Sequence, residues 1–248
     1  MSTPNPIDDP NPDKIRPVAS TLSTIILLLI VAAVAYIGYL HAGYLRATAE
    51  HGHVLEYAVT LAQEWLLLLF VVISMRRAST PLSVVIGGRW ESPKNALIDM
   101  LIAAIFWAFS AGVLAALQFS MGISAKERLA QVGFLVPQGW GELALWCTVS
   151  LSAAFCEEII FRGFLQRQFS AFTNSAAAGI VLQGFVFGAA HLYQGFKTPV
   201  VIAVYGILFG LLAHFRKSLR PGMIAHAWQD TIFGVALSFL AKYGKVQF

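Results

Sequence analysis

Six ionisable side chains interrupt three apolar segments in the last hundred residues of the 248-residue chain: Glu157, Glu158, Arg162, His191, His226 and Asp230. A charged side chain at the centre of a membrane helix costs at least about 2.5 to 3.5 kcal/mol, so such residues are candidates for function. A carboxylate that works together with imidazoles is typical of general acid–base chemistry. The set therefore predicts a site that activates water.

The spacing within each segment indicates which side chains act together. Glu158 and Arg162 are four residues apart, so a helix places them on one face, where carboxylate and guanidinium can pair. Neighbouring residues point about 100° apart on a helix, so Glu157 faces elsewhere and is left for a different role. A carboxylate partly withdrawn from water suits a general base. His226 and Asp230 have the same four-residue spacing and also share a face.

The composition identifies the solvent in which these residues must work. Hydrophobic residues make up 57% of the chain and charged residues 12%, whereas a soluble domain carries about 25% charged residues. This excludes a soluble domain and a disordered chain. The net charge of +4 is spread thinly without a basic stripe, so no nucleic-acid partner is expected. The expected surroundings are the lipid bilayer.

The apolar runs predict an all-α fold, a polytopic membrane helical bundle with about seven transmembrane helices and the site in the last four. The criterion is that a hydrocarbon core of about 30 Å takes about 20 apolar residues per helix. The predicted spans are 18–40, 57–74, 95–119, 141–162, 176–193, 199–215 and 222–241, and the fourth helix is expected to run on to about residue 172.

The remaining segments complete the predicted organisation. Residues 1–17 contain five prolines and are expected to be a disordered cytoplasmic tail. Residues 18–248 are expected to form a single transmembrane domain. A short interfacial amphipathic helix is expected within 124–136. Cys147 and Cys156 are nine residues apart, about 13 Å along a helix, so no disulfide is expected.

The loops predict the orientation. Ten Lys and Arg residues fall on the side of the N-terminus and six on the other, which favours a cytoplasmic N-terminus. The expected location is the plasma (inner) membrane.

The depth of each candidate residue along its span predicts that these residues lie in one layer of the membrane. Glu157 is five residues inside Arg162, and His226 is five residues beyond Pro221, so each lies about 8 Å from the cytoplasmic side. His191 reaches this layer only if the chain from 163 onward forms a hairpin that turns near residues 173–174. The loop 194–198 then lies within the membrane, which requires a watery cavity. The GxxxG spacings Gly184/Gly188 and Gly206/Gly210 predict close helix packing beside it.

The three segments resemble the motifs of the CAAX protease and bacteriocin-processing (CPBP, Abi-type) intramembrane protease family. EExxxR runs from Glu157 to Arg162, FxxxH from Phe187 to His191, and HxxxN or HxxxD from His226 to Asp230. The resemblance covers about residues 140–241. It implies an intramembrane endopeptidase that hydrolyses a peptide bond of a membrane-associated peptide or protein.

The resemblance also implies roles for the residues. Glu157 and His191 would activate water, and His226 with the residue at position 230 would stabilise the oxyanion. The supporting residues would be Glu158, Arg162 and Phe187. The eukaryotic CAAX enzymes have Asn where this chain has Asp230, and an ionised Asp cannot donate a hydrogen bond. Our hypothesis is that Asp230 orients His226 and favours its cationic form.

Other interpretations stay open at this point. Glu157, His191 and His226 could bind Zn²⁺ with one open position, although their spacing is unlike HExxH; we expect no obligatory metal. The chain could instead be a non-catalytic bacteriocin-immunity protein or membrane scaffold. A transporter is disfavoured because the sequence shows no inverted repeat. Prenylated and unprenylated substrates are both open, as is the oligomeric state.

Overall fold

The computed structural model describes residues 14–48 and 52–243 of the chain. All regular structure in these two ranges is helical, which confirms the all-α prediction. The elements are α1 (Thr21–Thr48), α2 (Val54–Arg77), α3 (Leu82–Ile86), α4 (Pro93–Ser120), α5 (Ala125–Val132), η3 (Gly133–Leu135), α6 (Trp140–Glu157), η4 (Glu158–Leu165), α7 (Gln166–Thr173), α8 (Ala176–Ala190), η5 (Leu192–Gln194), α9 (Thr198–Arg216) and α10 (Arg220–Lys242).

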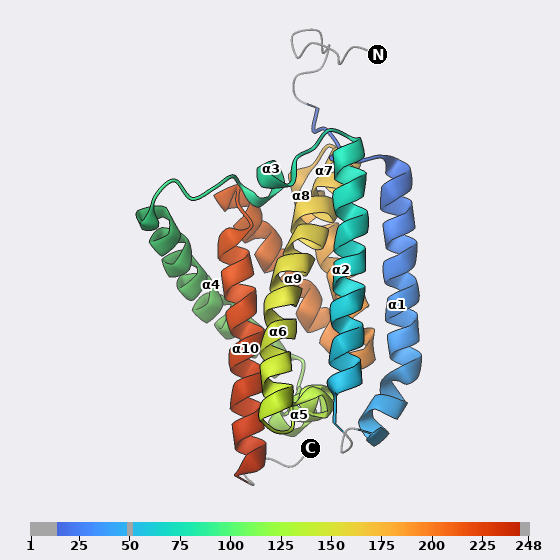
Figure 1. Ribbon diagram of the computed structural model, residues 1–248, viewed down its shortest axis with the longest axis vertical. Coiled ribbons are helices and arrows are strands. Elements are labelled where there is room, and N and C mark those ends of the chain that lie inside the picture. The colour runs from blue at the N-terminus through green and yellow to red at the C-terminus, as the bar shows by residue number, and fades with distance from the viewer. Residues whose placement is uncertain (1–13, 49–51, 244–248) are drawn as a thin grey trace.

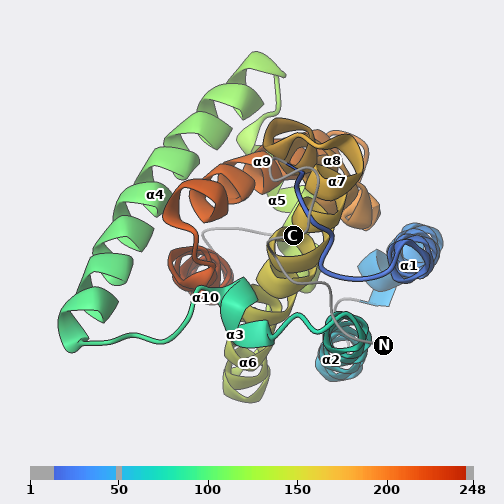
Figure 2. The same ribbon diagram turned by 90° about the horizontal axis from the view of Figure 1, so that it is seen from above.

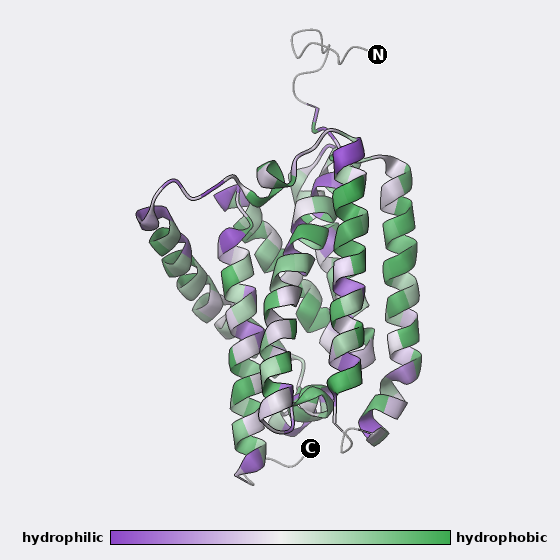
Figure 3. Ribbon diagram, viewed as in Figure 1, coloured by the Kyte–Doolittle hydropathy of each residue, from purple (hydrophilic) through white to green (hydrophobic). Residues whose placement is uncertain are grey.

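The long helices form a bundle in which α1, α2, α6 and α10 run along its long axis, while α4 is inclined to them (Figure 1). Seen from above, α4 and α1 lie on opposite sides of the bundle (Figure 2). Hydrophobic residues cover most of the length of the helices, and hydrophilic residues gather toward their ends (Figure 3). This distribution fits a bundle that crosses a bilayer, because only the ends of the helices then meet water and headgroups.

Within the described residues, five helical segments are long and apolar enough to cross a membrane: Thr21–Thr48, Val54–Arg77, Pro93–Ser120, Trp140–Thr173 and Thr198–Arg216. The predicted count of seven is therefore not confirmed, although the other two predicted spans are also helical, as α8 and α10. Helix α8 has only 15 residues. Helix α10 has 23 residues, but its polar positions lower its hydropathy.

The fourth helical segment continues beyond the site, as the sequence predicts. Helix α6 leads without interruption through η4 into α7, which ends at Thr173. Asn174 then takes a left-handed conformation with φ of 49°, which Asn tolerates better than most residues. Ser175 caps α8, since its side chain accepts a hydrogen bond from the backbone N–H of Ala178. The predicted hairpin with a turn at 173–174 is confirmed.

The start of the described chain is attached to this hairpin. The backbone N–H of Ile15 donates to Asn174 Oδ1 at 3.0 Å, and the N–H of Val18 donates to Gln168 Oε1 at 2.7 Å. Residues 14–17 form no helix or strand, but these hydrogen bonds hold the start of the described chain against α7 and the turn that follows it. The rest of the tail predicted to be disordered, residues 1–13, lies outside the described residues.

The short amphipathic helix predicted within 124–136 is present as α5. Ser124 and Glu127 form a capping box at its start, in which each side chain accepts a hydrogen bond from the other residue's backbone N–H. Lys197, from the segment between α8 and α9, pairs with Glu127 at 2.9 Å. The hydrogen bond from Lys197 lowers the pKa of the Glu127 carboxyl. The Lys197 charge thus has an acidic partner.

Helices α8 and α9 pack at very short range, as the GxxxG spacings predict. A Cβ atom on Gly188 would collide with the carbonyl oxygen of Pro199, and one on Gly184 would lie 2.9 Å from the carbonyl oxygen of Ala203. The Cβ of a larger residue at Gly206 would lie 3.0 Å from Gly184 Cα. Only glycine allows this approach, which holds the end of α8 and His191 against α9.

Candidate active site

His226 is the central residue of the site, because carboxylates approach both nitrogens of its ring. Its Nδ1 lies 3.3 Å from Glu158 Oε1. Its Nε2 lies 3.4 Å from Asp230 Oδ2 and 3.7 Å from Glu157 Oε2. Helix α10 supplies His226 and Asp230, one turn apart, and the junction of α6 with η4 supplies the two glutamates. One imidazole therefore joins two of the three motifs.

The two edges of this imidazole face different surroundings. On the Nδ1 edge, the side chains of Glu158 and Arg162 are both 0% exposed. On the Nε2 edge, the side chain of Glu157 is 21% exposed and that of Asp230 is 34% exposed. The Nδ1 edge is thus closed by the protein, and the Nε2 edge is the side on which water and a substrate can approach.

This arrangement favours a positively charged ring. A neutral imidazole donates a hydrogen bond through only one nitrogen, whereas an imidazolium donates through both. Both nitrogens of His226 face carboxylate oxygens, which only accept. The doubly protonated ring satisfies both edges, which agrees with the hypothesis that Asp230 favours the cationic form of His226.

The predicted pairing of Glu158 with Arg162 is confirmed. Arg162 Nη1 lies 3.0 Å from Glu158 Oε1. The guanidinium also lies over two aromatic rings, 4.3 Å from the centroid of Phe187 and 5.0 Å from that of Phe209. A cation over an aromatic face is attracted by the ring quadrupole. Contacts with Glu158 and with two aromatic rings therefore hold the guanidinium in place, and the guanidinium holds the Glu158 carboxylate.

The backbone that carries this pair is not a regular α-helix. Glu158–Leu165 forms a π-helical stretch between α6 and α7. Such stretches are rare, and they occur frequently at functional sites. All eight residues of the stretch are buried. The sequence predicts an α-helix here, and the pairing is nevertheless formed because Glu158 and Arg162 remain about one turn apart.

His191 joins the site through Phe187 and not by direct contact. His191 Nδ1 lies 2.8 Å from the carbonyl oxygen of Phe187, one turn earlier on α8. The ring of Phe187 lies 4.9 Å from the ring of His191 and 6.3 Å from that of His226. Over the described residues, no hydrogen bond or ion pair links His191 to either Glu157 or His226.

The bond to Phe187 determines which nitrogen of His191 is available. A carbonyl oxygen only accepts, so Nδ1 must carry the proton. The lone pair of the neutral ring then lies on Nε2. His191 is therefore presented as a base through Nε2, and Phe187 sets its tautomer as well as supporting Arg162.

The residues considered as metal ligands do not form a ligand set here. Among the described residues, no group of three or more His, Cys, Asp and Glu side chains is arranged to hold a metal ion. This includes Glu157, His191 and His226, which the Zn²⁺ alternative needs together. These side chains are thus not gathered as a ligand set in the described residues, and no step below depends on a metal ion.

Three buried carboxyl groups in predicted spans were not identified from the sequence. Glu64 on α2 is 6% exposed, Asp99 on α4 is 2% exposed, and Glu142 at the start of α6 is 9% exposed. The signal was present, since any ionisable residue inside a span is a functional candidate.

Asp99 anchors the start of α10, which carries His226. Its two carboxylate oxygens lie 2.9 Å from Arg216 Nη2 and 3.2 Å from Arg220 Nε. Trp90 Nε1 donates to the same carboxylate at 2.8 Å. The cluster ties α4 to the turn between α9 and α10. It therefore fixes where α10 enters the site.

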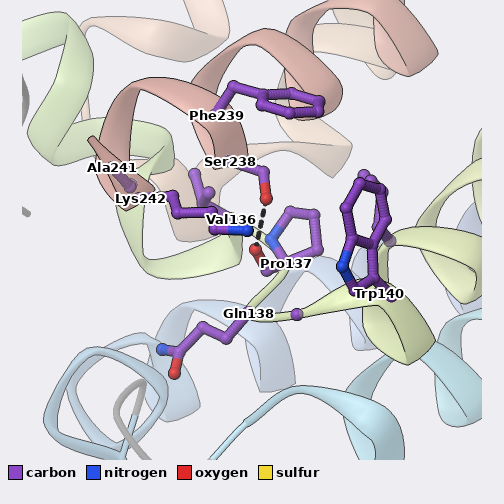
Figure 4. Close-up of a pocket in the computed structure, with 11 residues that line it drawn as sticks. Val136, Pro137, Gln138, Trp140, Ser238, Phe239, Ala241 and Lys242 are labelled. Atoms are coloured by element: carbon purple, nitrogen blue, oxygen red, sulfur yellow. Dashed lines mark hydrogen bonds between the residues drawn. The ribbon is translucent and has the colours of Figure 1, made fainter.

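A separate cavity of about 530 Å³ lies at the other end of α6. Trp140, Phe239 and Lys242 line it, and Ser238 donates a hydrogen bond to the carbonyl oxygen of Pro137 at 2.9 Å beside it (Figure 4). Trp140 precedes Glu157 by 17 residues, about 25 Å along a helix. The cavity is thus remote from His226.

The fold and the site define a class: a polytopic helical membrane protein with a carboxylate–histidine site between its helices. Residues 139–232 match a family model described as type II CAAX prenyl endopeptidase Rce1-like. This segment contains all three motifs, so the resemblance to the CAAX protease family is confirmed over it, and a membrane-protease-like function is supported. No curated protein and no solved structure significantly similar to the chain was found.

Proposed function

We propose that this protein is an intramembrane endopeptidase that hydrolyses a peptide bond of a membrane-associated peptide or protein with an activated water. The observation that carries the proposal is the asymmetric setting of His226. A buried ion pair holds one edge, and two partly exposed carboxylates flank the other. The open edge therefore places a base, Glu157, and a hydrogen-bond donor, the Nε2–H of His226, beside each other. Peptide hydrolysis requires both.

In the proposed mechanism, Glu157 and His191 Nε2 hold the water, and Glu157 takes a proton from it as the oxygen attacks the carbonyl carbon of the peptide. The carbonyl oxygen becomes an oxyanion, and the Nε2–H of cationic His226 donates to it. The C–N bond then breaks, and the leaving amine gains the proton that Glu157 took from the water. Preorganised donors of this kind stabilise the charge without reorganisation at the moment of reaction.

Asp230→Asn tests the role of the carboxylate beside His226. Asparagine keeps the size of the side chain but removes the charge that favours an imidazolium. We expect cleavage to slow by about 10- to 100-fold, the range known for carboxylates that orient metal-bound histidines, with the amount of folded protein unchanged. The measurement is the cleavage rate in membranes that contain equal amounts of each protein. Full activity of the variant would show that the carboxylate is not needed.

The proposal includes no obligatory metal. We expect prolonged treatment of the purified protein with a chelator such as EDTA or 1,10-phenanthroline to leave cleavage unchanged. Elemental analysis is expected to find less than one equivalent of zinc per chain. Loss of activity on chelation, restored by Zn²⁺ alone, would instead favour Glu157, His191 and His226 as ligands.

The proposed location is the plasma (inner) membrane, with a cytoplasmic N-terminus and the site open to the cytoplasmic side. The excess of Lys and Arg in the loops on that side supports this orientation. The expected partners are the lipid bilayer and a membrane-associated peptide or protein.

The experiment that tests the function compares the membrane proteomes of cells that carry the wild-type protein or Glu157→Ala. An uncut membrane peptide is expected to accumulate in the variant, and its new terminus in the wild type identifies the bond that is cut. The prenylation state of that peptide decides between the prenylated and unprenylated substrate classes. If a cellular effect of the protein persists in Glu157→Ala with no peptide accumulating, the chain acts as a scaffold or immunity protein.

A further inference from the structure

Glu64 lies beside the site on a helix outside the segment that matches the family. Helix α2 carries it ten residues from the first residue of that helix, Val54, and 13 residues before Arg77, so it is deep within the span. Its side chain is buried, and Ser152 Oγ donates a hydrogen bond to Glu64 Oε2 at 2.7 Å. Ser152 precedes Glu157 by five residues on α6, about 7.5 Å along the helix.

Several groups in and near the site interact electrostatically with this carboxyl. On α6 these are Cys156 and Glu157, and Cys156 Sγ lies 3.9 Å from Ser152 Oγ. On α10 they are His226 and Asp230, and between α8 and α9 Tyr193 also interacts with it. Glu64 therefore interacts electrostatically with the site, although α2 carries none of the three motifs.

The contacts of Glu64 indicate that it is a neutral acid. No Lys, Arg or His side chain forms an ion pair with it in the described ranges, and an unpaired buried carboxylate is costly. Ser152 donates to Oε2, so in the neutral acid Oε2 is the carbonyl oxygen. The acid proton then belongs to Oε1, for which the described part of the chain supplies no hydrogen-bond partner. Glu64 thus holds a proton that it can give up.

We propose that Glu64 is a positioning residue that acts through Glu157, holding a second proton that replaces the one Glu157 gives to the leaving amine. This inference rests on the proposed function. When Glu157 takes a proton from the attacking water, a proton must reach the leaving amine as the C–N bond breaks. Glu64 passes its proton to Glu157 as Glu157 gives the proton from the water to the amine, and Glu157 then returns a proton to Glu64. Two carboxyls that keep different protonation states are a recurrent way to divide acid and base roles.

The test uses three full-length variants in membranes of cells that lack the wild-type protein: Glu64→Gln, Glu64→Asp and Glu157→Gln. Glutamine at position 64 retains the size and the hydrogen bond from Ser152, but it cannot release a proton. The measured quantity is the rate at which the membrane peptides cut by the wild type disappear, divided by the amount of folded protein. Thermal unfolding in detergent shows whether each variant is folded, and the rate is divided by the amount of that folded protein.

We expect Glu64→Gln to fold like the wild type and to slow cleavage by about 100-fold or more. We expect Glu64→Asp, which retains an acid, to restore at least a tenth of the wild-type rate. Equal rates for Glu64→Gln and the wild type, with Glu157→Gln inactive, would overturn the role of Glu64 alone. Wild-type rates in Glu157→Gln would overturn the proposed function itself.

Discussion

Glu157→Gln is expected to abolish peptide-bond cleavage while the protein still inserts and folds. Glutamine has nearly the same size as glutamate, but its neutral amide cannot take a proton from water. Removal of a general base slows catalysis by about 10²- to 10⁴-fold. Loss of the negative charge beside Nε2 also weakens the cationic form of His226, so the effect is expected at the upper end of this range.

The fold is expected to tolerate this change. Glu157 Oε2 lies 3.7 Å from His226 Nε2, and the Glu157 side chain is partly exposed. Asp230 remains beside the same nitrogen at 3.4 Å. Removal of one partner is costly where it leaves a buried charge unpaired, and here His226 keeps the charge of Asp230. The thermal midpoint of the variant is therefore expected to stay close to that of the wild type.

Glu142→Gln is the matched control, because Glu142 is a buried glutamate on the same helix, remote from the site. It accepts hydrogen bonds from the backbone N–H groups of His53 and Gln138, each at 2.8 Å. It precedes Glu157 by 15 residues, about 22 Å along a helix. We expect it to cleave at the wild-type rate per folded molecule. If both variants cleave equally well, Glu157 is not the base.

Arg162→Met is expected to have the largest effect on stability. The variant leaves Glu158 buried without its guanidinium, and removal of one partner from a buried ion pair costs about 3 to 5 kcal/mol. The contacts of the guanidinium with Phe187 and Phe209 are lost as well. The measurement is unfolding in detergent micelles, followed by the loss of helical circular dichroism.

Two further variants separate the ion pair from the arginine itself. In Glu158→Gln/Arg162→Met no unpaired charge remains, and replacement of both partners is often nearly neutral, so we expect most of the lost stability to return. Arg216→Met removes an arginine whose partner Asp99 still has Arg220, and we expect a loss of about 0 to 1 kcal/mol. Equal losses of stability in Arg162→Met and Arg216→Met would show that the buried pair contributes no more to stability than the partly exposed one.

The local sequence was sufficient to predict the helices and two of the pairings. Each of the seven apolar runs is helical, because in lipid a backbone must satisfy its hydrogen bonds within its own segment. Four-residue spacing was enough for the contact between Glu158 and Arg162 and for that between His226 and Asp230, since both partners lie on one element. The three motifs also indicated the family over the segment that the family model matches.

The packing of helices far apart in sequence decided the rest. Glu157 and Glu158 approach opposite nitrogens of His226 because of where α10 lies against the π-helical stretch. The spacing of residues within one helix cannot predict this placement. Phe187 fixes the tautomer of His191 and lies near both its ring and that of His226, and Glu64 meets Ser152 only because α2 packs on α6. Local pattern determines how each segment folds, because its backbone bonds are internal. Contacts between segments depend on the shapes of both faces, so the tertiary structure alone decided them.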